Sequence, residues 1–93
     1  MLCSQIYLTV HRKIEGNEQK YEENKEVIRI YDDRITTASE HFQLRDILDI
    51  SFRNISDAKG FLYLHTTRGL YSYVTDNEPQ QLMRIFKELK KQN

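Results

Sequence analysis

The chain has 93 residues, of which 30% are charged and 39% are hydrophobic, and its 14 basic residues balance its 14 acidic ones. This length predicts one domain, spanning residues 1–93. The zero net charge disfavours binding of nucleic acid or anionic lipid by bulk electrostatics, which usually needs a basic excess.

Cys3 is the only cysteine, so an internal disulfide is excluded and a reducing compartment is favoured. A small, half-buried hydrophobic side chain is the expected role for it. No apolar run approaches the roughly 18 residues of a membrane span. The first residues lack the basic segment and apolar core of a secretion signal. The expected location is the cytoplasm.

Residues 4–14, "SQIYLTVHRKI", alternate between apolar and polar side chains and predict a strand with one buried face. The apolar positions assign Ile6, Leu8 and Val10 to the buried face. The intervening positions, assigned to the other face, are Gln5, Tyr7, Thr9 and His11. The polar stretch at residues 15–24, "EGNEQKYEEN", holds Gly16 and predicts an acidic loop.

Two further strands are predicted on either side of a tight turn at Asp32-Asp33. The first covers residues 25–31, with Ile28 and Ile30 on one side. The second covers residues 34–39, with Ile35 and Thr37 on one side.

The stretch "HFQLRDILDISFR", residues 41–53, fits two patterns. Leu44, Ile47 and Leu48 have helical spacing, whereas the flanking residues alternate as in strands. A helix here would be short, without a clear cap, and would place its flanking apolar residues poorly. We therefore predict a strand at 41–45, a corner at Arg45-Asp46 and a strand at 48–53.

Residues 54–60 predict a turn that ends at Gly60, and a hairpin follows. A three-residue loop, Thr67-Arg68-Gly69, would pair Thr66 with Leu70, and Gly69 would supply the positive φ that such a loop needs. In this register one face holds the aliphatic residues Leu62, Leu64, Leu70 and Val74. The other face holds Phe61, Tyr63, His65, Tyr71 and Tyr73.

The last element is an amphipathic helix over about residues 78–91. Asp76 or Asn77 is the expected cap and Pro79 fits a first helical turn. The apolar stripe comprises Leu82, Ile85, Phe86 and Leu89, with Met83 beside it. About seven short strands followed by one helix predict a mainly β fold, an antiparallel barrel or sandwich with the helix covering one end.

This order of elements resembles the pleckstrin homology (PH) superfold, including its GRAM-type and small bacterial relatives. The resemblance lies in "FQLRDILDISF", "GFLYLHTTRGLYSYV" and "NEPQQLMRIFKELKK", and it covers nearly the whole chain as a loose pattern. The resemblance implies a PH-like fold, which does not by itself give a function.

Lipid-binding PH domains hold inositol phosphates with basic residues on and between their first two strands. The resemblance places Arg12, Lys13, Lys20 and Arg29 at those positions, with His11 beside them. The same region carries the carboxylates Glu15, Glu18, Glu22, Glu23 and Glu26, which would repel a polyphosphate. Binding of anionic lipid headgroups is therefore the alternative function rather than the first.

The sequence gives little support to catalysis or cofactor binding. There is no Gly-rich phosphate loop, HExxH or GxSxG motif, and the acidic pairs are explained by turns. His11, His41 and His65 have no close Cys or His partner of the kind zinc sites show. We expect a non-enzyme without metal, cofactor or small-molecule substrate.

A protein partner is the favoured expectation. Tyrosine is enriched at interfaces, so the predicted face with Phe61, Tyr63, His65, Tyr71 and Tyr73 is the candidate contact surface, for another protein or in a homodimer. Cross-strand pairing of Tyr63 with Tyr73 and of His65 with Tyr71, which would merely stabilise the hairpin, would explain the same residues. A small OB-type barrel that stacks bases on these tyrosines is the second alternative, and its sparse basic neighbours, Arg53 and Arg68, disfavour nucleic acid.

Overall fold

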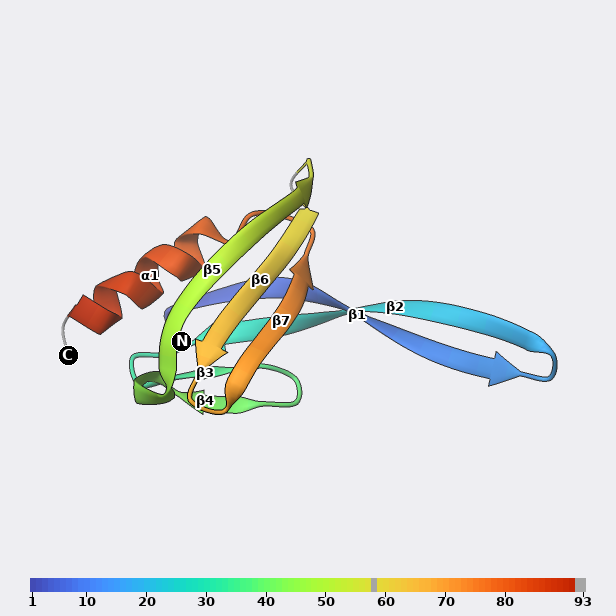
Figure 1. Ribbon diagram of the computed structural model, residues 1–93, viewed down its shortest axis with the longest axis horizontal. Coiled ribbons are helices and arrows are strands. Elements are labelled where there is room, and N and C mark those ends of the chain that lie inside the picture. The colour runs from blue at the N-terminus through green and yellow to red at the C-terminus, as the bar shows by residue number, and fades with distance from the viewer. Residues whose placement is uncertain (58, 92–93) are drawn as a thin grey trace.

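The computed structural model describes residues 1–57 and 59–91, except for the side chains of His11 and Arg12. Seven strands are followed by one helix (Figure 1). The strands are β1 (Cys3–Glu15), β2 (Glu18–Ile30), β3 (Arg34–Thr36), β4 (His41–Gln43), β5 (Ile47–Ser56), β6 (Lys59–Thr66) and β7 (Gly69–Thr75). The helix is α1 (Gln80–Lys91). The prediction of a mainly β, antiparallel fold with a C-terminal helix is confirmed.

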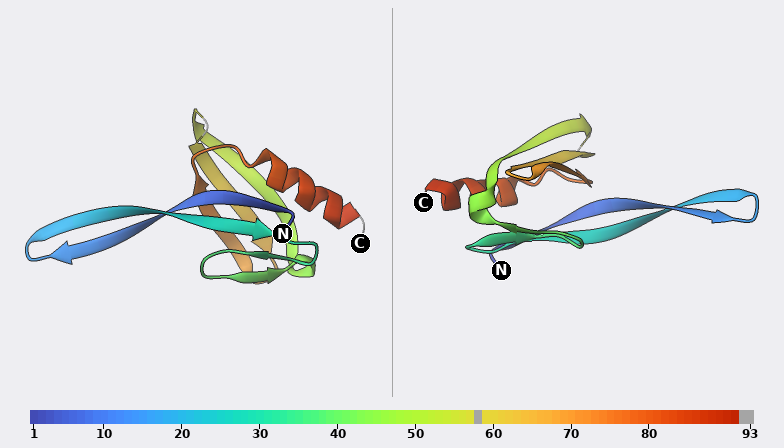
Figure 2. Two further views of the ribbon diagram at one scale, coloured as in Figure 1. Left: turned by 180° about the vertical axis from the view of Figure 1, so that it is seen from behind. Right: turned by 60° about the horizontal axis from the view of Figure 1, so that its bottom comes forward.

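All the strands belong to one antiparallel sheet in the order β4-β3-β2-β1-β7-β6-β5. The sheet folds over itself, so that the β5–β7 part lies across the β1–β4 part as a second layer (Figure 2). Within the described residues, the edge strands β4 and β5 do not pair with each other, so the sheet is not closed. Helix α1 lies against β1 and β5 at one end of the two layers.

A single apolar core fills the space between the layers and the helix. It draws on both layers through fully buried side chains such as Ile28, Ile30, Phe42 and Leu64, and on α1 through Leu82 and Phe86. The predictions for Ile28, Ile30 and Ile35 are confirmed, because each is fully buried.

The prediction for the buried face of β1 is confirmed for Leu8 and wrong for Ile6 and Val10. Tyr7 is 3% exposed, whereas Ile6 is 45% and Val10 is 65% exposed. Residues that pair across a sheet share a face, and Tyr7 shares its face with Gln5, which pairs with the buried Ile28. The tyrosine hydroxyl also accepts a hydrogen bond from the Ala38 N–H at 3.1 Å, so burial leaves it a partner.

The predicted loop at residues 15–24 is also wrong. These residues continue β1 and β2 as a long hairpin whose turn is Gly16-Asn17, between the paired residues Glu15 and Glu18. Gly16 has a φ of 61°, as the first position of a type II′ turn requires. A strand pair exposed on both faces can be as polar as a loop, so the composition of this stretch did not reveal it.

This hairpin projects from the molecule and sets its longest dimension of 54 Å, against 28 and 23 Å for the others (Figure 1). We call its outer part, residues 9–24, the arm. The pairing of β1 with β7 is limited to Leu8 with Val74, and that of β2 with β3 to Arg29 and Ile30. The described part of the arm therefore has a strand neighbour on one side only.

The corner between β4 and β5 is confirmed as a strand–corner–strand unit. The corner is one 3-10 turn, Leu44–Asp46, which explains the helical spacing seen in the sequence. Leu44 and Ile47 are buried while Leu48 is 64% exposed, because the chain straightens into β5 after Ile47. The backbone N–H of Thr67 donates to the Asp46 carbonyl at 2.9 Å and holds the corner against the β6–β7 turn.

The predicted register of the β6–β7 hairpin is wrong by one residue. Thr66 pairs with Gly69 across a two-residue loop, Thr67-Arg68, and not with Leu70. The Thr66 hydroxyl donates to the Gly69 carbonyl at 2.7 Å and accepts from the Arg68 N–H at 3.1 Å, which fixes the tighter turn. Gly69 has the expected positive φ, at 126°.

The turn predicted at residues 54–60 is shorter than expected, because β5 continues to Ser56 and β6 begins at Lys59. Residue 58, between them, lies outside the described part. Helix α1 begins at Gln80 rather than near residue 78, directly after the buried Pro79. The Asn77 side chain accepts a hydrogen bond from the Gln5 amide, so it joins the end of β7 to β1.

Of the three glycines, Gly60 has the least space for a side chain. An added Cβ would lie 2.3 Å from the Arg53 carbonyl oxygen and 2.7 Å from the Phe52 ring. We expect Gly60→Ala to lower the free energy of unfolding by about 1–3 kcal/mol, as overpacked sites do. Urea unfolding would measure it, with Ser72→Ala on an exposed position of β7 as the control. Equal stability of Gly60→Ala and the control would contradict the packing described for this hairpin.

Candidate interaction surfaces

The aromatic face predicted from the sequence is divided between the two sides of the sheet. Phe61, Tyr63 and His65 alternate with the buried Leu62 and Leu64 and lie on the outer side of β6. Their partners on β7 are Val74, Ser72 and Leu70. All three predicted residues of β6 are half-buried.

Tyr71 and Tyr73 lie on the inner side, opposite the buried Leu64 and Leu62. The Tyr73 ring meets Tyr7 edge-on, with centroids 5.0 Å apart and an angle of 76°. The Tyr71 ring meets Phe42 in the same way, at 4.9 Å and 69°. The one-residue difference in register causes this change, since it moves every β7 side chain to the opposite face. The predicted cross-strand pairs of Tyr63 with Tyr73 and of His65 with Tyr71 are therefore wrong.

On the outer side, His65 Nε2 lies 2.9 Å from the Ser51 hydroxyl. Phe61 and Tyr63 pack with ring centroids 6.0 Å apart. A serine next to a histidine is one element of a nucleophilic site, but such a site also needs a cavity that holds substrate. These two residues stand on the surface of the sheet, where the contact orients the imidazole.

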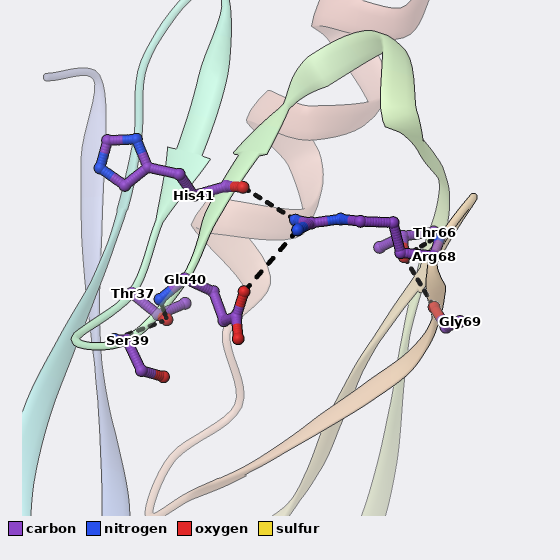
Figure 3. Close-up of polar contacts among 7 residues, drawn as sticks. All are labelled: Thr37, Ser39, Glu40, His41, Thr66, Arg68 and Gly69. Carbon is purple, nitrogen blue, oxygen red and sulfur yellow. Dashed lines mark hydrogen bonds and ion pairs between the residues drawn. The ribbon is translucent and has the colours of Figure 1, made fainter.

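Arg68 fastens the β6–β7 turn to the start of β4 (Figure 3). Its guanidinium donates to the His41 carbonyl at 2.8 Å and lies 3.9 Å from the Glu40 carboxylate. It also covers the Phe42 ring at 4.9 Å from the centroid. The Glu40 N–H in turn donates to the Thr37 hydroxyl at 3.0 Å. Arg68 thus joins two parts of the fold, and the nearby Glu40 carboxylate offsets its charge, which disfavours a role in binding phosphates.

A shallow groove of about 960 Å³ runs along this edge, beside the 3-10 corner. Two of its basic groups have partners: Arg34 lies 2.8 Å from the Asp33 carboxylate, and Lys90 donates to the Leu44 carbonyl at 3.2 Å. Among the described side chains, no three His, Cys, Asp or Glu residues gather closely enough for a metal ion. The side chain of His11 lies outside the described residues.

Two of the residues predicted to bind lipid are paired with glutamates on the arm. Lys13 Nζ lies 3.6 Å from Glu22, and Lys20 Nζ lies 3.5 Å from Glu15. Arg29 is exposed near the far end of β2, nine positions from Lys20, or about 30 Å along a strand. The side chain of Arg12 lies outside the described residues. The three described cations therefore do not converge on one point.

The arm carries the apolar surface that the sequence interpretation missed. Val10, Ile14 and Tyr21 are 65%, 68% and 66% exposed. The register pairs Val10 with Glu23 and Ile14 with Gln19, so odd positions of β2, including Tyr21, share a face with even positions of β1. The three apolar side chains therefore lie on one face of the arm. The residues of the two ion pairs, Lys13–Glu22 and Lys20–Glu15, lie on the opposite face.

Comparison of the chain with models of protein families, with curated proteins and with solved structures found no match. In the part of the chain that the structure describes, no helix is long and apolar enough to cross a membrane. Cys3 is half-buried, as expected, and burial raises the pKa of its thiol.

Tyr63 and Tyr73 offer a matched test of the two faces, since both are half-buried tyrosines on neighbouring strands. We expect Tyr73→Ala to lower the free energy of unfolding by about 2–4 kcal/mol, because it removes a ring from the core. Tyr63→Ala on the outer side should lower it by about 1 kcal/mol or less. Chemical unfolding followed by circular dichroism would measure both. Equal losses would contradict the register of the β6–β7 hairpin.

Stability at high pH should depend on Tyr73. Burial raises the pKa of its phenol above the ordinary value of 10.0, although a hydrogen bond with Thr37 opposes the shift. The folded chain thus holds this proton more tightly than the unfolded chain does. The neutral phenol contributes stability that is present below about pH 10 and is lost as the pH rises through the raised pKa.

We therefore expect Tyr73→Phe to be slightly less stable than the wild type near neutral pH and to become relatively more stable above about pH 10. Urea midpoints of both proteins, measured from about pH 7 to pH 11, would show the two curves approaching or crossing. A constant gap across this range would mean that Tyr73 does not control alkaline unfolding.

Proposed function

We propose that this chain is a non-catalytic, PH-like interaction module, and that it binds a protein partner through the arm. The order of seven strands and a helix supports the PH-like assignment. The observation that carries the function is the set of exposed apolar residues on the arm, Val10, Ile14 and Tyr21. We place this activity in the cytoplasm, because the single thiol, Cys3, is suited to a reducing compartment.

A projecting strand pair is suited to contact with another molecule. Two isolated strands are at best marginally stable in water, and an apolar face makes them a site for further packing. The outer edges of both strands also offer backbone N–H and C=O groups to an added strand. A protein partner can use both features, whereas a small molecule would find no enclosing wall.

Anionic lipid is the weaker alternative. The ion pairs Lys13–Glu22 and Lys20–Glu15 leave this face of the arm without a cationic patch. The apolar residues lie on the face opposite Lys13 and Lys20, so that these two cations and the apolar surface would not enter a membrane interface together.

The test uses two triple variants matched for exposure. The arm variant is Val10→Thr, Ile14→Thr and Tyr21→Thr. The control carries Leu48→Thr, Ile55→Thr and Leu70→Thr, whose native side chains are 64%, 55% and 60% exposed and lie off the arm. Threonine keeps the strand propensity while it removes most of the apolar surface.

Each protein would serve as bait in native extract, and the retained proteins would be quantified by mass spectrometry. We expect one partner to be enriched by the wild type and the control, and to fall by about tenfold or more with the arm variant. Flotation with phosphatidylserine vesicles tests the lipid alternative in parallel. Equal retention by both variants, or loss of vesicle binding in the arm variant alone, would overturn the proposal.

A further inference from the structure

The outer edge of β2 is an unpaired strand edge of unusual length. The register joins β2 to β3 only at Arg29 and Ile30, so from Glu18 to Ile28 the described chain provides no strand on that side. Glu15 and Glu18 close a two-residue turn and form a hydrogen-bonded pair, after which bonded and non-bonded pairs alternate. Lys20 and Glu22 therefore bond to β1. Gln19, Tyr21 and Glu23 direct their backbone groups outward.

We propose that two copies of this chain associate through these edges, β2 against β2, with a two-fold axis at Tyr21. The inference rests on the proposed function and names its partner as a second copy. Tyr21 would face Tyr21 of the second copy as a hydrogen-bonded antiparallel pair. Glu18 of each copy would pair with Asn24 of the other. The paired stretch, residues 18–24, would therefore end before Arg29, where β3 begins to pair.

The charges of β2 select this register. A two-fold axis perpendicular to the sheet places the same face of both copies on the same side. Because opposed residues share a face and side chains alternate, the axis must pass through a residue, and the other residues pair symmetrically about it. An axis at Lys20 would oppose two lysines and also Glu18 to Glu22. An axis at Glu22 would oppose two glutamates. An axis at Tyr21 places Lys20 opposite Glu22 twice and opposes no like charges.

The intermolecular pairs would also join the ion pairs that exist within each arm. Lys20 already lies 3.5 Å from Glu15, and Glu22 lies 3.6 Å from Lys13. Lys20 would lie beside Glu22 of the second copy. Across the four strands the order would then be Glu15 and Lys20 of the first copy, followed by Glu22 and Lys13 of the second copy, so that the signs of charge alternate. The symmetry repeats this row on the other side of the axis. Networks of this kind contribute more than isolated surface pairs.

The same register unites the apolar residues. A perpendicular two-fold axis leaves Val10, Ile14 and Tyr21 of both copies on one face of a four-stranded sheet. The two tyrosine rings would then be cross-strand neighbours, which is a favourable aromatic pairing. Two marginal two-stranded arms would thereby become one four-stranded sheet with these apolar side chains on one face, and three or more strands are the usual requirement for stability.

The outer edge of β1 is less suitable for a second copy. Its outer half carries the consecutive basic residues Arg12 and Lys13. An axis at either residue would oppose like charges at the centre of the interface. An axis nearer the turn, at Ile14, leaves only the tip of the arm to pair.

Disulfide trapping tests the register directly. In a Cys3→Ser background, Tyr21→Cys would place two thiols opposite each other, with Cα atoms about 5.5 Å apart, within the range that a disulfide spans. We expect mild oxidation to convert most of this variant to a covalent dimer. The matched variants Gln19→Cys and Glu23→Cys should not cross-link alone, but a mixture of the two should, because residue 19 faces residue 23.

Sedimentation of the unmodified protein provides the second readout. We expect its mass to rise from 11.2 kDa toward twice that value as concentration increases. Lys20→Glu and Glu22→Lys should each remain monomeric alone, because each variant would place like charges at positions 20 and 22 of the two copies. The two variants should associate when mixed, because opposite charges then meet at both contacts, as they do in the wild type. Equal cross-linking at positions 19, 21 and 23, or a mixture that stays monomeric, would overturn the register.

The two proposals fail in distinguishable ways. A monomeric wild type whose Tyr21→Cys variant does not cross-link would overturn self-association, while loss of a different captured protein in the arm variant would leave the proposed function intact. Unchanged capture in that arm variant, together with a monomeric wild type, would overturn both.

Discussion

The structure depends on the contacts through which the two layers of the sheet share one core. Tyr73 meets Tyr7, and Tyr71 meets Phe42, each with an edge-to-face geometry that aromatic rings favour. The two-residue β6–β7 turn makes these contacts possible, because it alone directs both tyrosines inward. Arg68, in that turn, then covers Phe42 and bonds to the start of β4. One short turn thus sets the register, directs the β7 tyrosines into the core and joins the second layer to the edge strand β4.

The arm is supported by its continuity with that core. The inner parts of β1 and β2 contribute Tyr7, Ile28 and Ile30 to the core, and the same two strands extend beyond it without interruption. Hydrogen bonding propagates from this anchored part, so the outer part does not pay the cost of nucleating a hairpin alone. The body of the fold therefore acts as a support that presents a polar strand pair and a few apolar side chains to the solvent.

How far the sequence predicted this structure depends on whether a segment contacts the core. The corner at Leu44–Asp46, the strand with Ile28 and Ile30, and the apolar stripe of α1 were predictable because burial makes their patterns regular. The arm was not, since residues 15–24 are solvated on both faces and have the composition of a loop. The buried face of β1 was misassigned because Tyr7, an aromatic residue with a polar group, replaces the aliphatic Ile6 in the core.

The exposed residues of the arm were missed as a contact surface because the arm was predicted to be a loop. A wrong loop length in the β6–β7 turn also assigned the contact surface to another part of the sheet. A three-residue loop at Thr67-Arg68-Gly69 would have gathered five aromatic or imidazole side chains on one surface, whereas the two-residue loop sends Tyr71 and Tyr73 into the core. Tyr21, on the arm, is 66% exposed and stands among charges that pair across strands. On one face of β2, Lys20 stands between Glu18 and Glu22. An edge that would otherwise attract any strand therefore accepts one register and opposes its neighbours. Selectivity of this kind is what an exposed edge needs if it is to bind one partner without aggregating.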